Sequence, residues 1–264
     1  MADLELTHQD GITTLIFNRP EARNALSMEM RSMLCDALHD AENDPSVRCV
    51  VLKGKGEHFL AGGDVKGMSQ TLAQPQKELK KQFVLRIHEL NPILFAMRRM
   101  PKPVISSVRG AAAGAGMSFA LASDLVISSE DAFYILAHCH IGTTPDGAAT
   151  FYLPRTVGIK KAMEITLLGG RVDAQTAKEW GLINFLVPAD SIEAETDKLA
   201  RRLAKGPTHV YGKAKALVYR SMESEFESQL QAEAESFADC ASRADFREGV
   251  TAFVEKRKAV FTGN

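Results

Sequence analysis

A run of small residues directly after an apolar segment is the feature that most constrains the fold. Residues 103–108 (PVISSV) are typical of a buried strand, and GAAAGAGMSFALA follows at residues 110–122. Glycine and alanine let the backbone approach a neighbour closely, and the run opens what we predict to be a helix. Glycine-rich backbone at a helix N-terminus offers aligned N–H groups to a developing oxyanion. The segment predicts an oxyanion cradle, and close packing of a small-residue helix on a strand is the alternative.

The rest of the chain has strand signals early and helix signals late. Residues 4–8 and 12–17 predict a hairpin around Asp10-Gly11, because strand-forming runs flank a turn-forming pair. Further strands are expected at 47–52, 103–108, 125–128, 132–136 and 182–187. Helices are expected at 28–42 with Ser27 as N-cap, at 75–100 with a kink or break at Pro92, at 147–157, at 160–168, and from about 190 onward.

Repeated strand–strand–helix units predict an α/β (α+β) fold built of stacked turns of sheet and helix instead of a doubly wound sheet. We expect a core over residues 1–199 and a helical C-terminal region over residues 200–264.

Charge and cysteine content exclude several classes of protein. The 264 residues include 32 Lys and Arg against 33 Asp and Glu, so no global basic field attracts nucleic acid or an anionic membrane. The four cysteines are widely spaced without a CxxC pair, which argues against a disulfide framework and a structural zinc site. The first ten residues lack the basic and apolar regions of a secretory signal. We expect a cytoplasmic protein with no nucleic-acid or membrane partner.

Two further segments could contribute to a site. In His58–Asp64 (HFLAGGD), Gly62 and Gly63 can expose N–H groups to a ligand, and a tight turn is the alternative. In residues 137–147, His138 and His140 would share a face if extended. No third ligand accompanies them, so no metal site is expected. Asp146 precedes an apolar-periodic run, so it is either a helix N-cap or a base that faces a pocket.

Two other motifs match the glycine-rich segment less well. Gly114-x-Gly116 could begin a dinucleotide fingerprint, but Phe119 replaces the third glycine and Asp124 follows too soon for the ribose contact. Gly116-Met-Ser118-Phe-Ala120 is similar to the nucleophile elbow of hydrolases with its last glycine replaced. A hydrolase therefore remains a minor alternative.

Taken together, the segments resemble the crotonase (enoyl-CoA hydratase/isomerase) superfamily nearly end to end. The resemblance is carried by LIFNRPEARNAL at 15–26, AGGDVKGM at 61–68, PKPVISSVRGAAAGAG at 101–116 and FVEKRK at 253–258. It implies a spiral of ββα turns with a helical C-terminal trimerisation region. It also implies acyl-CoA substrates, a homotrimer or dimer of trimers, and no cofactor besides the CoA of the substrate.

The resemblance also assigns site residues. The N–H groups of Ala61 and Ala115 would hold the thioester oxygen, and Arg23 would contact the CoA head group. Gly62 and Asp64 lie in the same segment as Ala61 and are expected to line the CoA site. A second group, Phe253 and Lys256, would reach the adenosine-phosphate end, often across a subunit boundary.

The sequence departs from the hydratase pattern. Ser118 and His138 stand where hydratases of this family carry two glutamates. Asp146 stands where many hydratases have glycine, and where members of the ring-1,2-epoxyphenylacetyl-CoA isomerase and 4-chlorobenzoyl-CoA dehalogenase types have a catalytic aspartate. The resemblance thus favours an enoyl-CoA isomerase in which Asp146 removes a proton and returns it one or two carbons away.

Three other functions stay open. Hydration or lyase chemistry would use His138 with Asp146, and a non-catalytic acyl-CoA binder would keep only the cradle. Dehalogenation is less favoured because the family's neighbouring tryptophan is missing, the one tryptophan being Trp180.

The acyl group is predicted from apolar residues of the 68–100 segment, which favour a medium to large apolar or aromatic chain. They are Met68, Phe83, Leu85 and Phe95.

Overall fold

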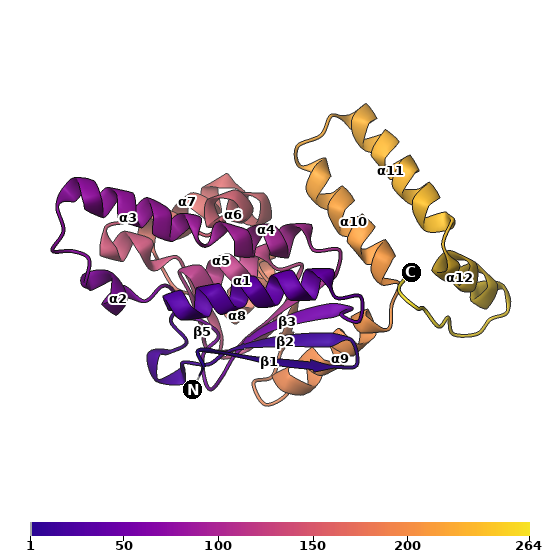
Figure 1. Cartoon of the computed structure of the whole chain (residues 1–264), viewed down its shortest axis with the longest axis horizontal. Helices are drawn as coiled ribbons and strands as arrows, with labels where there is room; N and C mark the ends of the chain where they lie inside the picture. Colours follow the sequence, from indigo (N-terminus) through magenta and orange to yellow (C-terminus); the bar gives the residue numbers. More distant parts are fainter. Residues whose placement is uncertain (1) are drawn as a thin grey trace.

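Two sheets organise the chain in the computed structural model, which describes residues 2–264 (Figure 1). The larger sheet has the order β1-β2-β3-β4-β6-β9, with β1 antiparallel to β2 and every other pair parallel. Its strands are β1 (Leu4–Gln9), β2 (Ile12–Phe17), β3 (Cys49–Gly54), β4 (Val104–Val108), β6 (Leu125–Ser129) and β9 (Phe185–Val187). The smaller sheet, of order β5-β7-β8, consists of β5 (Ala111–Ala113), β7 (Phe133–Ile135) and β8 (Val172–Asp173).

Helices follow the strands and fill the C-terminal part. Those of the first 180 residues are α1 (Met28–Asn43), α2 (Val65–Ser69), α3 (Gln76–His88), α4 (Asn91–Arg99), α5 (Ala115–Ala122), α6 (Ala149–Val157), α7 (Ile159–Leu168) and α8 (Ala174–Glu179). The later ones are α9 (Ile192–Ala204), α10 (Thr208–Ser221), α11 (Phe226–Ala241) and α12 (Ala244–Val254). Two short 3-10 helices, η1 (Pro20–Ala22) and η2 (Ala137–Ile141), occur in loops.

The chain winds as a spiral in which each turn visits both sheets before entering a helix. The turn β4, β5, α5 is followed by the turn β6, β7, α6. Two isolated parallel bridges continue the small sheet toward earlier turns of the spiral. In one, Leu60 pairs with Ala112 of β5, and in the other Leu26 pairs with Gly63. The predicted strand–strand–helix repeat is confirmed, and the bridges place the glycine-rich segments of successive turns side by side.

The large sheet separates two apolar layers. Along β3, Val50 and Leu52 face the main core with α1, whereas Cys49 and Val51 face a smaller cluster with Ala200 of α9. This alternation is the period of two expected of a strand buried on both faces. Because α9 covers the sheet, the division expected between residues 199 and 200 falls inside a helix of the core.

Local signals set the ends of several helices. Ser27 caps α1 as predicted, since its Oγ accepts the N–H of Met30 at 3.0 Å. The helical pattern over 75–100 divides into α3 and α4, with Pro92 in the first turn of α4 where its missing N–H costs nothing.

The Ser27 cap gives a prediction about stability. Ser27→Ala leaves the Met30 N–H without its acceptor, and we expect a loss of about 1 kcal/mol in the free energy of unfolding. Ser32→Ala changes an exposed serine in the same helix and serves as the control, with an expected change within about 0.5 kcal/mol. Urea unfolding monitored by circular dichroism measures both. Equal values for the two variants would contradict the role of the cap.

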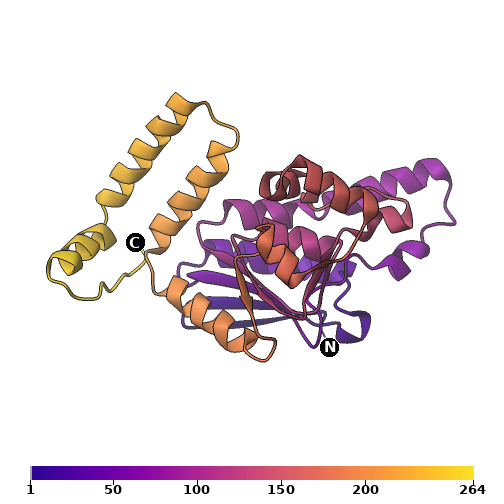
Figure 2. The ribbon, with the colours of Figure 1, turned by 180° about the vertical axis from the view of Figure 1, so that it is seen from behind.

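Helices α10, α11 and α12 form an extension that projects from the sheets and their covering helices (Figures 1 and 2). A buried ion pair ties it to the core, with Lys215 Nζ of α10 located 2.7 Å from Asp124 Oδ2. Burial raises the pKa of the Asp124 carboxyl and lowers that of the Lys215 ammonium, so each charge depends on the other. The predicted helical C-terminal region is present and begins as a separate unit at α10.

Candidate active site

The cradle is formed where two glycine backbones touch. Gly62 and Gly114 have φ values of +93° and +49°, in the region that favours glycine. A Cβ added to Gly114 would lie 3.4 Å from the Gly62 Cα, and one added to Gly62 would lie 3.4 Å from the Ala113 oxygen. The positive φ values therefore favour glycine at the two positions, while an added Cβ would only make ordinary van der Waals contact.

The hydrogen bonds around this contact correct the first predicted donor. The Ala61 N–H already donates to the Arg23 carbonyl at 3.0 Å, so Ala61 is wrong as an oxyanion-binding residue. At Gly63, two residues after Ala61, the chain is bridged to Leu26. The Leu26 N–H donates to the Gly62 carbonyl at 2.8 Å, and the Asp64 N–H donates to the Leu26 carbonyl at 3.3 Å. The Gly63 N–H therefore points to the other side of its strand, the side on which Leu60 pairs with Ala112. Within residues 2–264 it donates to no backbone or side-chain acceptor.

The second predicted donor lies at a helix start. Ala115 is the first residue of α5, whose N-cap is Gly114, so its N–H has no acceptor within the helix. The positive end of the helix dipole lies at this N–H and favours negative charge there. Gly63 and Ala115 thus present two N–H groups from adjacent turns of the spiral.

Asp146 and His138 lie together beside this backbone. Asp146 Oδ1 is 3.4 Å from His138 Nε2, and the two side chains are 23% and 10% exposed. A Cβ on Gly114 would lie 3.7 Å from His138 Cε1, which places the imidazole against the cradle. Both Asp146 Oδ1 and His138 Nδ1 are buried, and among the residues described neither has a hydrogen-bond partner. This carboxylate oxygen is therefore free to accept a proton.

The capping role considered for Asp146 is wrong. Helix α6 begins at Ala149 with Ala148 as N-cap, and Ala148 adopts a φ of +61° without any side-chain cap. Asp146 takes part through its carbonyl instead, which accepts the Ala149 N–H at 3.2 Å. Its side chain is left to the site.

Ser118 supports the loop and is not a nucleophile. It is fully buried inside α5, and its Oγ lies 3.2 Å from the Gly114 oxygen and 3.0 Å from the Asp146 oxygen. A nucleophile elbow would expose the hydroxyl at a strand-to-helix turn. The hydrolase alternative is therefore wrong, and Ser118 links the cradle helix to the Asp146 loop.

The expected CoA-binding residues lie in different places. Arg23 is exposed and adjoins the cradle through its carbonyl, at the end of η1. Asp64 caps α2, where its Oδ1 accepts the Gly67 N–H at 2.9 Å, and its Oδ2 lies 3.6 Å from Arg19 Nη1. Those contacts occupy the Asp64 carboxylate, and its negative charge would repel phosphate, so we leave it out of the CoA site.

The last two predicted residues belong to the extension. Phe253, on α12, is 85% exposed, and Lys256 follows the helix with a φ of +56°. Helix α12 lies away from α2 and α5 in both views (Figures 1 and 2). One chain therefore does not bring these residues to the cradle.

A buried arginine next to the cradle was missed in the sequence. Arg31 of α1 is 3% exposed, and its Nη2 would lie 3.8 Å from a Cβ on Gly63. Burial and the neighbouring Arg86 guanidinium lower the pKa of Arg31 to about 10, while the charges of Asp146 and Glu89 oppose that shift. The sequence does hold a signal, since Arg31 precedes Leu34 and Leu38 by three and seven residues and so lies on the buried stripe of α1.

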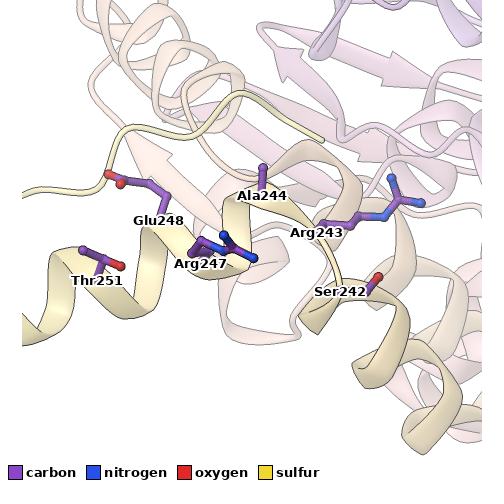
Figure 3. A pocket seen from close by; sticks show the side chains of 6 residues that line it. All are labelled: Ser242, Arg243, Ala244, Arg247, Glu248 and Thr251. Carbon is purple, nitrogen blue, oxygen red and sulfur yellow. The ribbon is translucent and has the colours of Figure 1, made fainter.

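Other features of the structure lie outside this site. A surface cavity of about 460 Å³ is lined by α12 and the residues before it, Ser242, Arg243, Ala244, Arg247, Glu248 and Thr251 (Figure 3). A second cavity, of about 440 Å³, lies between α4 and α10. Over residues 2–264 no cluster of three metal-ligating side chains occurs. In the same range no helix is long and apolar enough to span a bilayer.

The amino-acid sequence is similar to those of known proteins over nearly its whole length. Residues 7–264 match the family described as enoyl-CoA hydratase/isomerase. The chain is 36% identical to 1,2-epoxyphenylacetyl-CoA isomerase of Escherichia coli K12, with all of both chains covered. It is 33% identical to trans-2-decenoyl-[acyl-carrier-protein] isomerase of Streptococcus mutans, covering 96% of this chain and 95% of the relative.

A solved structure has the same fold as this chain. The enoyl-CoA hydratase of Polaromonas sp. JS666 superposes with a TM-score of 0.92 at 31% identity, covering 98% of this chain and 99% of that one. The spiral predicted from the sequence is thus confirmed, and the relatives include both isomerases and hydratases. The chain belongs to the enoyl-CoA hydratase/isomerase family of enzymes.

Proposed function

We propose that this protein is an enoyl-CoA isomerase that moves a carbon–carbon double bond along the acyl chain of a CoA thioester. The observation that carries the proposal is the Asp146 carboxylate, whose Oδ1 is buried, lacks a hydrogen-bond partner and lies beside His138 and the cradle. A carboxylate in that position is a base that can take a proton from a carbon next to the thioester.

The proposed reaction needs one acid–base group and one oxyanion site. The N–H groups of Gly63 and Ala115 hold the thioester oxygen, which gains charge when Asp146 removes a proton from C2 of a 3-enoyl chain. The electron pair moves into a dienolate, and the protonated Asp146 returns the proton to C4. The C2–H bond is broken, the C4–H bond is formed, and the product is the conjugated 2-enoyl thioester. No cofactor besides the CoA of the substrate is required.

His138 has a supporting part in this scheme. At 3.4 Å its Nε2 can hold the Asp146 carboxylate on the cradle side, and its ring covers Gly114. Hydration is the second candidate, because the same pair could activate water. We favour isomerisation since Ser118, at one of the two positions where hydratases carry glutamate, is fully buried and its hydroxyl contacts two carbonyls.

Product analysis separates the candidates. We expect 3-enoyl-CoA thioesters to be converted into 2-enoyl thioesters of unchanged mass, seen as a rise in the absorbance of the conjugated thioester. A product heavier by one water would instead assign the hydratase. Saturable binding of all the thioesters with no conversion would assign a non-catalytic acyl-CoA binder.

We also propose that the active form is a homotrimer or a dimer of trimers located in the cytoplasm. Large apolar side chains are exposed on the extension, namely Phe226, Phe237, Phe246, Phe253 and Val254. An apolar surface of that extent favours burial against another copy. In such an assembly Phe253 and Lys256 would bind the adenosine-phosphate end of a CoA whose head group contacts Arg23. All four cysteines are free thiols, which supports a reducing compartment.

A further inference from the structure

The side chains near Arg31 bear on the acyl group that the site accepts. Arg31 comes from α1 and Arg86 from α3, and the Arg31 Nη1 donates to the Arg86 carbonyl at 2.7 Å. That contact is to the main chain of Arg86, and the Arg86 guanidinium lies close enough to help lower the pKa of Arg31. Two guanidinium groups therefore lie near each other on the side of the site where Arg31 adjoins Gly63. Like charges placed together in a buried region repel each other.

The donors of this arginine pair are incompletely used. The Nε atoms of Arg31 and Arg86 are both buried and, within residues 2–264, have no hydrogen-bond partner. In the same range neither guanidinium takes part in an ion pair, although the charges of Asp146 and Glu89 act on Arg31 at longer range. A buried charged donor without a partner costs free energy, so this arrangement calls for an acceptor that the substrate brings.

Not all of the residues predicted to line an apolar acyl pocket pack around the cradle, so one of its walls can be polar. Leu85 and Phe95 are 54% and 61% exposed, so within one chain much of their apolar surface is not packed against the core. Met68 does approach the cradle, because its Cε would lie 2.8 Å from a Cβ on Gly63. The wall beside Gly63 therefore combines one flexible apolar side chain, Met68, with the Arg31 guanidinium, which Arg86 adjoins.

We propose that Arg31 and Arg86 bind a carboxylate at the far end of the acyl group, so that the substrate is a CoA thioester of an unsaturated dicarboxylic acid. This inference rests on the acyl-CoA site of the proposed function. Guanidinium groups match carboxylates in shape and charge, and one carboxylate between the two would satisfy both free donors and relieve their repulsion.

Binding of saturated thioesters tests the inference without any turnover. Adipoyl-CoA and hexanoyl-CoA have the same chain length and differ in a terminal carboxylate, and the eight-carbon pair suberoyl-CoA and octanoyl-CoA allows for a deeper site. By calorimetry we expect the protein to bind the carboxylate member of at least one pair about 10- to 100-fold more tightly. Equal dissociation constants within both pairs would overturn the proposal.

Variants then locate the effect. Arg31→Met and Arg86→Met should each remove that preference while changing the dissociation constant of the neutral thioester less than about threefold. Methionine fills a similar volume without charge, so the fold should tolerate it, and thermal unfolding checks this. Arg99→Met, at an exposed arginine of α4, is the matched control and should leave all four constants unchanged.

The two proposals can fail separately. If 3-hexenoyl-CoA is isomerised but no carboxylate preference exists, the arginine inference falls and the isomerase stands. If adipoyl-CoA is preferred in an Arg31-dependent way while no thioester is isomerised, the isomerase falls and the binding site stands. Equal weakening of both members of a pair in Arg31→Met would also overturn the inference, because it would indicate a general effect on the site.

Discussion

Asp146→Asn is expected to lower the rate of double-bond migration by about 10²- to 10⁴-fold while acyl-CoA binding changes little. Asparagine keeps the shape of the side chain but has no oxygen basic enough to take a carbon-bound proton. The Asp146 carbonyl still accepts from Ser118 and Ala149 in the variant, so the loop keeps its main-chain contacts. The measurement is the initial rate of conjugated-thioester formation, together with the dissociation constant of a saturated acyl-CoA.

Exchange with solvent isolates the chemical step. In deuterated water the protein should introduce deuterium at C2 of a 3-enoyl thioester or at C4 of the product, and Asp146→Asn should abolish that exchange. Asp190→Asn, at an exposed aspartate before α9, is the matched control and should behave as the unchanged protein. Retention of both exchange and migration in Asp146→Asn would reject the assigned base.

Ala115→Pro is expected to lower the same rate by about 10²- to 10³-fold, because proline removes the N–H that would face the thioester oxygen. The first position of a helix accepts proline, since its N–H makes no intrahelical bond. The residue before it, Gly114, has φ +49° and ψ −115°, outside the helical region that proline disfavours in its predecessor. The fold should therefore survive while the donor is lost.

Ala115→Gly is the control for the loss of the side chain, because glycine keeps the N–H. We expect it to retain most of the activity, and circular dichroism should show both variants folded. If Ala115→Pro is fully active, the N–H of residue 115 does not hold the oxyanion. If the glycine variant loses as much as the proline variant, packing of the Ala115 methyl group explains the effect.

The sequence predicts those parts of the molecule that local chemistry determines. The Asp10-Gly11 hairpin, the Ser27 cap and the break near Pro92 all follow from residues within one turn of the feature. Helix α5 after strand β4 was equally evident from its small residues. The strand β5 was not, because three alanines carry no strand signal until they pair with Leu60 and Phe133.

The site shows the same division between local and long-range information. Ala115 could be placed from its position at a helix start. The change from Ala61 to Gly63 could not, because it depends on which N–H the distant Arg23 carbonyl accepts. The partners of Arg31 are likewise invisible in the sequence, since Arg86 lies 55 residues away and meets it only after α1 and α3 pack.

The two isolated bridges have a consequence for how such an enzyme can diversify. They hold Leu60 and Gly63 to neighbouring turns by main-chain contacts that any residue can make. The residues that follow, from α2 to the end of α3, carry few such ties; they include Met68, which adjoins Gly63, and Arg86, whose carbonyl accepts from Arg31. Substitutions in that segment can change substrate selectivity while the proposed oxyanion-binding N–H groups keep their positions. A new specificity can therefore evolve without a change in the proposed catalytic residues.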